Sequence, residues 1–183
     1  MITPPTLNNI IFIDIESSGL YHESYPIEIG YGCTPDAITS FLITPENTPD
    51  WQTWSEEGEA IHKITRDMLY QSGISPLAAA QKMNDDLHGK CVYSNAPEFD
   101  WNWIRELFFV VGERPEFTIR DSIEIYKPGL VLVGGSEDEI AVTYEEINAM
   151  AWDKVGKWKQ HRVTPDVLQQ LYLAQLISQK AQK

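Results

Sequence analysis

The chain has 183 residues, of which 43% are hydrophobic and 22% are charged, and this composition is typical of an ordinary globular domain. A chain of this length is expected to form one domain, over residues 1–183, and it lacks the run of roughly 20 apolar residues that a membrane-spanning helix needs. Its 14 basic and 27 acidic side chains give a net charge of −13. This balance argues against a protein that grips long stretches of phosphate backbone, which usually requires a basic face.

Hydrophobic patterning in the first half of the chain predicts three strands before any helix. Apolar residues nearly fill the first strand, as in a strand buried on both faces of a sheet. The turn Thr34-Pro35-Asp36 joins the next two strands as a hairpin. Ser75-Pro76 marks a helix start, because proline is favoured in the first turn. In chain order the pattern predicts strands at 10–15, 26–32 and 37–43, short helices beginning near 55 and 65, and a helix at 75–87.

The second half of the chain alternates between predicted strands and helices. The pattern predicts strands at 90–94 and 117–120 and helices at 97–111, 144–152 and 164–180. Residues 127–142 are Gly-rich and acidic and match neither period, so we expect an insertion or a hairpin there. A hairpin followed by strand–helix alternation favours an α/β fold with a mixed sheet.

The amino terminus and the cysteines indicate where the protein resides. The first nine residues, MITPPTLNN, have neither the basic start nor the apolar centre of a secretory signal. Cys33 and Cys91 form no CxxC pair, which fits two reduced thiols better than a disulfide or a zinc site. We therefore expect a cytoplasmic protein with no membrane partner.

Two carboxylates interrupt the first predicted strand. Asp14 and Glu16 lie two residues apart in the stretch FIDIESSGL, so a strand directs both to the same face. Like charges this close raise each other's pKa and cost stability unless a cation neutralises them. A solvated edge strand could also carry such a pair, but this strand has too few polar positions for that. A lone pair of this kind more often faces solvent, and it is in combination with the segments described next that it favours a metal site.

Three other segments place an acid or an imidazole beside a strand end, a turn or a helix start. They are residues 61–65 (IHKIT), residues 94–100 (SNAPEFD) and residues 161–166 (HRVTPD). Taken singly, Asp100 and Asp166 would be first-turn acids that stabilise helix dipoles. Combined with the pair on the first strand, they supply four carboxylates, which suit Mg²⁺ or Mn²⁺ better than zinc.

Such a carboxylate set suits the hydrolysis of phosphodiesters. Two divalent ions held by shared carboxylates are the usual apparatus for attack on a phosphodiester. His161 stands five residues before Asp166, and an unperturbed histidine pKa of about 6.5 suits a general base.

These four segments, in this order, resemble the motifs of the DEDDh exonucleases, which are DnaQ-like 3′–5′ exonucleases of the ribonuclease H-like fold. FIDIESSGL looks like the motif hhhDxET(T/S)GL, and IEIG at 27–30 looks like the strand that commonly follows it. The other three segments resemble IHGIT, NxxFD with one extra residue, and HxAxxD. The resemblance covers about residues 11–171. It implies a ribonuclease H-like α/β fold, with a mixed five-stranded sheet flanked by helices.

The resemblance also implies a role for each matching position. Asp14, Glu16, Asp100 and Asp166 would hold two Mg²⁺ (or Mn²⁺) ions, and His161 would act as the general base. The residues that would contact the terminal nucleotide are Ser17, Ser18, Leu20, Ile61, His62 and Asn95.

The chain departs from the family pattern at several positions, none of which removes a proposed ligand or the base. Lys63 stands where the family usually has glycine, and Val163 and Val167 stand where it has small residues. One extra residue lies between Asn95 and Phe99, which makes the role of Asn95 the least direct inference.

We therefore expect a metal-dependent 3′–5′ exonuclease that hydrolyses single-stranded DNA or RNA ends to nucleoside 5′-monophosphates. Two alternatives stay open, namely a ribonuclease H-like binding module with a silent site and a small-nucleotide phosphodiesterase. The residues separate neither DNA from RNA nor a monomer from a homodimer. The cations expected beside the substrate are Lys154, Lys157, Lys159 and Arg162, although a solvated helix end explains them equally well.

Overall fold

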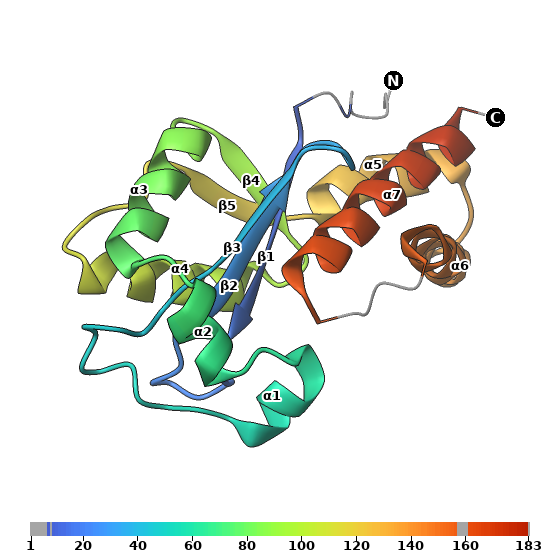
Figure 1. Cartoon of the computed structure of the whole chain (residues 1–183). Coiled ribbons are helices and arrows are strands. Elements are labelled where there is room, and N and C mark those ends of the chain that lie inside the picture. The colour runs from blue at the N-terminus through green and yellow to red at the C-terminus, as the bar shows by residue number, and fades with distance from the viewer. Residues whose placement is uncertain (1–6, 8, 157–160, 183) are drawn as a thin grey trace.

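A mixed five-stranded sheet forms the centre of the computed structural model, which describes residues 7, 9–156 and 161–182 (Figure 1). The strand order is β3-β2-β1-β4-β5; β1, β2 and β3 are antiparallel neighbours, and β4 and β5 run parallel to β1. The predicted mixed sheet is confirmed, as is the hairpin between the second and third strands. The strands are β1 (Ile11–Ser17), β2 (Pro26–Gly32), β3 (Ile38–Leu42), β4 (Cys91–Ser94) and β5 (Thr118–Asp121).

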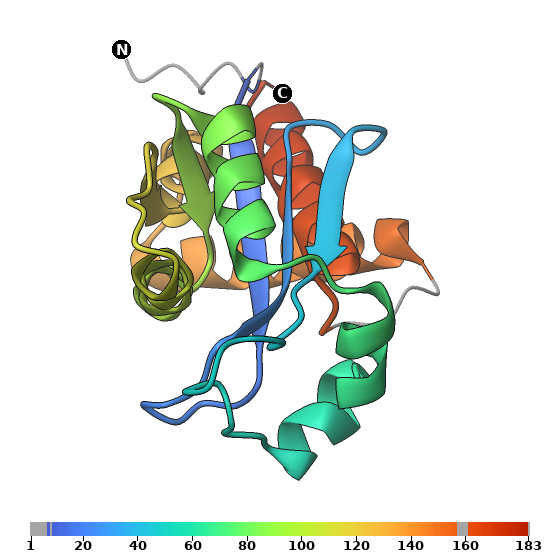
Figure 2. The ribbon, with the colours of Figure 1, turned by 60° about the vertical axis from the view of Figure 1, so that its left-hand side comes forward.

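Helices cover both faces of the sheet. Helices α3 and α4 lie on one face and α5 and α7 on the other, while α1 and α2 lie beyond one end of the strands (Figures 1 and 2). Among the residues that the structure describes, no helix is both long enough and apolar enough to cross a lipid bilayer. The helices are α1 (Glu56–His62), α2 (Arg66–Ser72), α3 (Pro76–Leu87), α4 (Pro97–Val110), α5 (Ile123–Val133), α6 (Glu137–Val155) and α7 (Val163–Ala181).

The alternation of β1 sends its side chains into two separate cores. Ile13 and its odd-numbered neighbours pack with α3 and α4, whereas Phe12 belongs to the core under α5 to α7 and stacks on Tyr126 with ring centroids 5.9 Å apart. Because side chains alternate along a strand, Asp14 and Glu16 share the face of Phe12. Both carboxylates therefore face the layer that contains α7.

The segment 127–142, expected as an insertion or a hairpin, does not form a hairpin of strands. It comprises the end of α5, a turn at Gly134 and Gly135 with positive φ, and the start of α6. Pro128-Gly129 interrupts the sequence pattern but lies inside α5, where Ile177 of α7 packs against the bare Cα of Gly129. Tertiary packing thus stabilises a helix that the local pattern does not predict.

Candidate active site

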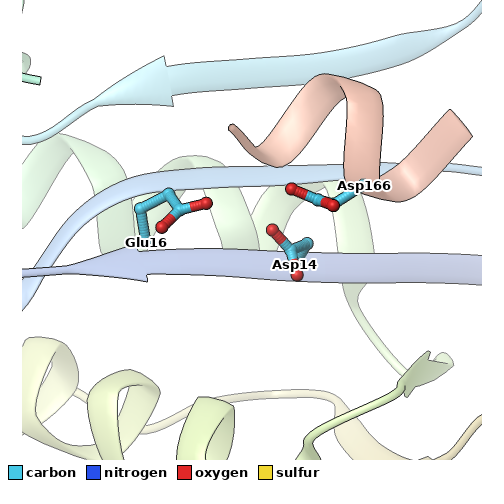
Figure 3. Close-up of side chains that lie close together, drawn as sticks. All are labelled: Asp14, Glu16 and Asp166. Carbon is cyan, nitrogen blue, oxygen red and sulfur yellow. The ribbon is translucent and has the colours of Figure 1, made fainter. Parts of the chain in front are cut away.

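Three predicted carboxylates come together where β1 meets the first turn of α7. Asp14 and Glu16 project from β1 toward Asp166 (Figure 3), and each of the three offers a carboxylate oxygen, all within 4.8 Å of one another. All three side chains are partly buried. Residues that are 152 positions apart in the sequence thus form one acidic cluster, which is the core of the predicted metal site.

A glycine on β2 allows α7 to approach this closely. Gly30 pairs with Asp14 across the sheet, and a Cβ atom on it would lie only 2.6 Å from Cγ2 of Val163, the first residue of α7. No side chain larger than hydrogen fits at Gly30 without moving the helix. Val163, one of the departures from the family pattern, is therefore accommodated by packing directly on the sheet.

The electrostatics of the cluster favour either protonation or a bound cation. Burial is the main cause that raises the pKa of Asp14 well above its usual value, and the carboxylates of Asp100, Asp166 and Glu16 raise it further. Burial, followed by the negative charge of Asp166, raises the pKa of Glu16 to about 8. Hard oxygen donors gathered in this way fit Mg²⁺ or Mn²⁺, whose charge would offset the repulsion. The residues present therefore fit the implied metal.

Asp100 lies beside the cluster and is held by a neighbouring hydroxyl. It is in the first turn of α4, as predicted, and is only 2% exposed. The Ser94 hydroxyl donates a hydrogen bond to Asp100 and accepts one from the Ala96 N–H at 2.8 Å. Burial raises the pKa of Asp100 to about 7, although the bond from Ser94 lowers it. Among the described residues the cluster within 4.8 Å contains Asp14, Glu16 and Asp166, and Asp100 acts on it through its charge.

A cleft of about 560 Å³ opens beside the acidic cluster. His161 is exposed, has a left-handed backbone conformation with φ of 63°, and lines this cleft together with His62. The other predicted site residues that line the cleft are Glu16, Ser17, Leu20 and Ile61.

The predicted nucleotide contacts divide into exposed residues and residues that shape the loop. Leu20 is 79% exposed and Ile61 is 54% exposed at the cleft, as expected for contacts with a ligand. Ser17 donates to the Gly19 carbonyl at 2.7 Å, and the buried hydroxyl of Ser18 accepts from the Tyr25 N–H at 3.1 Å. The two hydroxyls therefore stabilise the turn after β1.

Asn95 lies at the end of β4, where the sequence has its extra residue. It is exposed, and it is not among the described residues that line the 560 Å³ cleft. A second hollow of about 580 Å³ runs along α4 and shares Leu20, Tyr21 and Trp103 with the first.

His62 carries a proton donor for which the described residues offer no acceptor. The Ile64 N–H donates to Nδ1 at 3.0 Å, so the proton of a neutral His62 must be on Nε2. Burial lowers the pKa of His62, which keeps the ring neutral near pH 7. Nε2 is buried and makes no hydrogen bond to the described part of the chain. His62 thus places a buried donor without an acceptor on the wall of the cleft, as far as the described residues show.

Lys63, where the family usually has glycine, ends α1 just after His62. It has a left-handed conformation with φ of 62°. Glycine adopts this conformation without steric cost, whereas for another residue it costs about 1 kcal/mol. The substitution therefore does not prevent the turn after His62.

The contact between Glu28 and Arg162 was not predicted from the sequence. Arg162 was expected as a cation beside the substrate, but its guanidinium binds the buried carboxylate of Glu28. Lys154 lies over the ring of Tyr172, 5.5 Å from its centroid, and Lys157 and Lys159 fall outside the described residues. Glu28 is the one charged residue of β2, and all seven residues of that strand are buried. A single charge inside an otherwise apolar predicted strand was the sequence signal that Glu28 needs a partner.

Comparison with known proteins supports the fold. No protein-family model and no curated protein matches the chain in sequence. Solved structures do resemble it, namely E. coli exonuclease I in complex with a dA16 oligonucleotide (14% identity, TM-score 0.69), the zinc-bound E. coli exonuclease I–ssDNA complex (16%, 0.66) and an apo exonuclease I (15%, 0.65). Each match covers 93% of this chain but only 40–42% of the other chain. The predicted ribonuclease H-like α/β fold is confirmed, and identities this low show the fold alone.

Proposed function

We propose that the protein is a metal-dependent 3′–5′ exonuclease that hydrolyses single-stranded DNA or RNA ends to nucleoside 5′-monophosphates. The observation that carries this proposal is the convergence of Asp14, Glu16 and Asp166 within 4.8 Å, beside an open cleft that His161 lines. The structural neighbours include exonuclease I structures with bound oligonucleotides, which supports a single-stranded substrate.

The carboxylates of Asp14, Glu16, Asp100 and Asp166 would hold two Mg²⁺ or Mn²⁺ ions. When bound, such ions lower the pKa of an attacking water and neutralise charge on the phosphate. The exposed imidazole of His161 would take the proton from that water at the edge of the cleft.

The walls of the cleft would orient the last nucleotide. Leu20 and Ile61 offer apolar contact to its base or sugar, and His62 Nε2–H offers a hydrogen bond. The hollow along α4, lined by Tyr21, Phe99 and Trp103, could receive the preceding nucleotide, because aromatic side chains stack on bases of any sequence. Contacts of this kind select a strand end without reading its sequence.

A cleavage assay on 5′-labelled DNA and RNA oligonucleotides in Mn²⁺ tests the proposal. We expect a ladder of products that shortens from the 3′ end and disappears with a chelator. His161→Ala should lower kcat by about 10²–10⁴-fold, because a general base contributes that much, while Mn²⁺ binding measured by calorimetry is retained. Endonucleolytic products would contradict the proposal.

Two outcomes of the same assay would favour the alternatives. Intact oligonucleotides under all conditions would indicate a binding module with a silent site. Faster turnover of mononucleotide esters than of oligonucleotides would indicate a phosphodiesterase for small nucleotides.

Leu20→Ala is expected to weaken substrate binding without destabilising the protein. Leu20 lies where the two hollows meet and is 79% exposed, so its loss removes apolar contact with the substrate and little contact with the core. We expect KM for an oligonucleotide to rise about fivefold to tenfold, as for the loss of about 1 kcal/mol of apolar contact, with kcat nearly unchanged. Val142→Ala, at a residue 59% exposed on α6, is the control and should change neither constant. An unchanged KM in Leu20→Ala would remove Leu20 from the binding site.

A further inference from the structure

A partly buried ion pair joins the start of α7 to the middle of the sheet. Arg162 Nε donates to Glu28 Oε2 at 2.8 Å and Nη2 donates to Oε1 at 2.6 Å, so the contact is bidentate. The Glu28 side chain is 6% exposed, and that of Arg162 is 36% exposed. The two residues are 134 positions apart in the sequence, and the contact fixes a chain segment far from β2.

The buried charge of Glu28 requires an explanation, because burying a carboxylate costs free energy that its attraction to a partner often fails to return. Its position suggests one. Glu28 is paired with Glu16 in the β1–β2 register, and Arg162 directly follows His161. One member of the ion pair therefore adjoins a proposed metal ligand across the sheet, and the other adjoins the proposed general base along the chain.

Main-chain bonds extend the same contact to the first turn of α7. The Val163 N–H donates to Glu28 Oε2 at 3.3 Å, and the Arg162 N–H donates to Asp166 Oδ2 at 3.1 Å. In the described part of the chain, Arg162 is the N-cap of α7 and makes no side-chain capping bond. Glu28, on another element, thus accepts one of the first N–H groups of α7, which have no acceptor within the helix.

The backbone of His161 indicates that this anchoring is needed. Its φ of 63° is left-handed, a conformation that a non-glycine residue keeps only where the surrounding structure holds it. Two contacts of the next residue restrain this segment, because the Arg162 side chain binds Glu28 and the Arg162 N–H binds Asp166.

We propose that Glu28 and Arg162 are positioning residues, which hold His161 and Asp166 in the places that hydrolysis requires. This inference rests on the proposed function, because it assigns the pair a role in that same site. Neither side chain touches the reacting atoms in this proposal. The pair acts by fixing the chain from His161 to Asp166 on β2.

Glu28→Gln is the first test, because it keeps the shape of the side chain and removes the charge that binds Arg162. Hydrogen exchange of the Val163 and Asp166 amides should become about tenfold faster, as for a local opening at the start of α7. In the cleavage assay kcat should fall by about 100-fold with little change in KM, since small misplacements of catalytic groups cost that much. Arg162→Lys keeps the charge but not the bidentate geometry, and should have an intermediate effect on both readouts.

A double-mutant cycle with His161→Ala separates positioning from a general structural role. If the pair acts mainly through His161, Glu28→Gln should lower kcat by at most about twofold more once that histidine is gone. Arg120→Gln, which breaks an exposed Arg–Glu pair on β5 and α5, is the matched control and should alter neither exchange nor kcat.

The readouts keep this inference distinct from the proposed function. Faster exchange in Glu28→Gln of a protein that cleaves no oligonucleotide would support the anchor and reject the nuclease proposal. An active wild type whose Glu28→Gln variant keeps both its exchange rates and its kcat would overturn the anchor. Equal losses of kcat with and without His161, together with unchanged exchange of the Asp166 amide, would also overturn it. Should Glu28→Gln fail to fold, Arg162→Lys is measured by exchange and kcat in its place, and unchanged values of both would overturn the anchor.

Discussion

Asp14→Asn is expected to abolish nuclease activity and, in the same molecule, to stabilise the metal-free fold. Burial and the charges of Asp100, Asp166 and Glu16 all oppose ionisation of Asp14. An amide of the same shape removes an ionisable group whose charge is unfavourable in the metal-free fold. We expect a gain of about 1–2 kcal/mol in chelator, since replacing poorly compensated buried charge often stabilises by this order. For a chain of this size the gain is about 2–8 °C in Tm. Activity in Mn²⁺ should fall at least about 1,000-fold, because a metal site is worth several kcal/mol of transition-state stabilisation.

The control for this variant is Asp85→Asn, at an exposed aspartate on α3. It removes the same charge from a solvated position and should leave both Tm and activity unchanged. Tm is measured by thermal unfolding in chelator, followed by circular dichroism. Activity is measured by the labelled-oligonucleotide assay in Mn²⁺. A lower Tm for Asp14→Asn in chelator would mean that the carboxylate stabilises the fold by itself, and the acidic cluster would then not need a cation.

The central strand and its carboxylates were predictable because their signals are local. The alternation of β1 places Asp14 and Glu16 on one face, and the apolar run around them marks the strand as buried. Asp166 was predictable as a first-turn residue of a long helix. That these elements meet, however, depends on packing between α7 and Gly30, which no local pattern contains. Only the resemblance of the ordered motifs to a known family suggested it.

The parts that sequence interpretation missed are long-range contacts. Residues 127–142 were expected to form an insertion or a hairpin, yet Gly129 lies within helix α5, where Ile177 of α7 packs against it. Arg162 resembles a free cation until Glu28, 134 positions away, is brought beside it. In both cases the deciding contact joins residues far apart in the chain. Such tertiary contacts can override the structure that local propensity predicts.

The acidic cluster also predicts how pH and metal together control stability. The pKa of Asp166 is raised from 3.8 to about 6, that of Asp100 from 3.8 to about 7, and that of Glu16 from 4.5 to about 8, with burial as the first cause in each case. Acids with raised pKa values bind more protons in the folded state than in the unfolded state. Their contribution to stability is therefore fully present below about pH 4 and is lost as pH rises through about 6, 7 and 8.

In chelator, Tm should accordingly fall between about pH 5 and pH 8, because each unit of raised pKa is worth about 1.4 kcal/mol at most. His62 opposes this trend, since its lowered pKa adds stability as pH rises, but it is one group against the three carboxyls and Asp14. Saturating Mn²⁺ should reverse the slope. A divalent cation needs the ionised carboxylates, so its binding releases protons and stabilises the folded state more at higher pH.

Thermal unfolding at about pH 5, 6, 7 and 8, in chelator and in Mn²⁺, measures both slopes. Glu16→Gln removes the group with the pKa of about 8, so the fall of Tm in chelator should be shallower between about pH 7 and pH 8 in this variant. A Tm in chelator that stays constant or rises across this range would contradict the prediction. The same would hold for a Mn²⁺ effect of equal size at every pH, because a cation that displaces no protons is not bound by these carboxylates. The repulsion between Asp14 and Glu16 would then be relieved by some other means than the proposed metal.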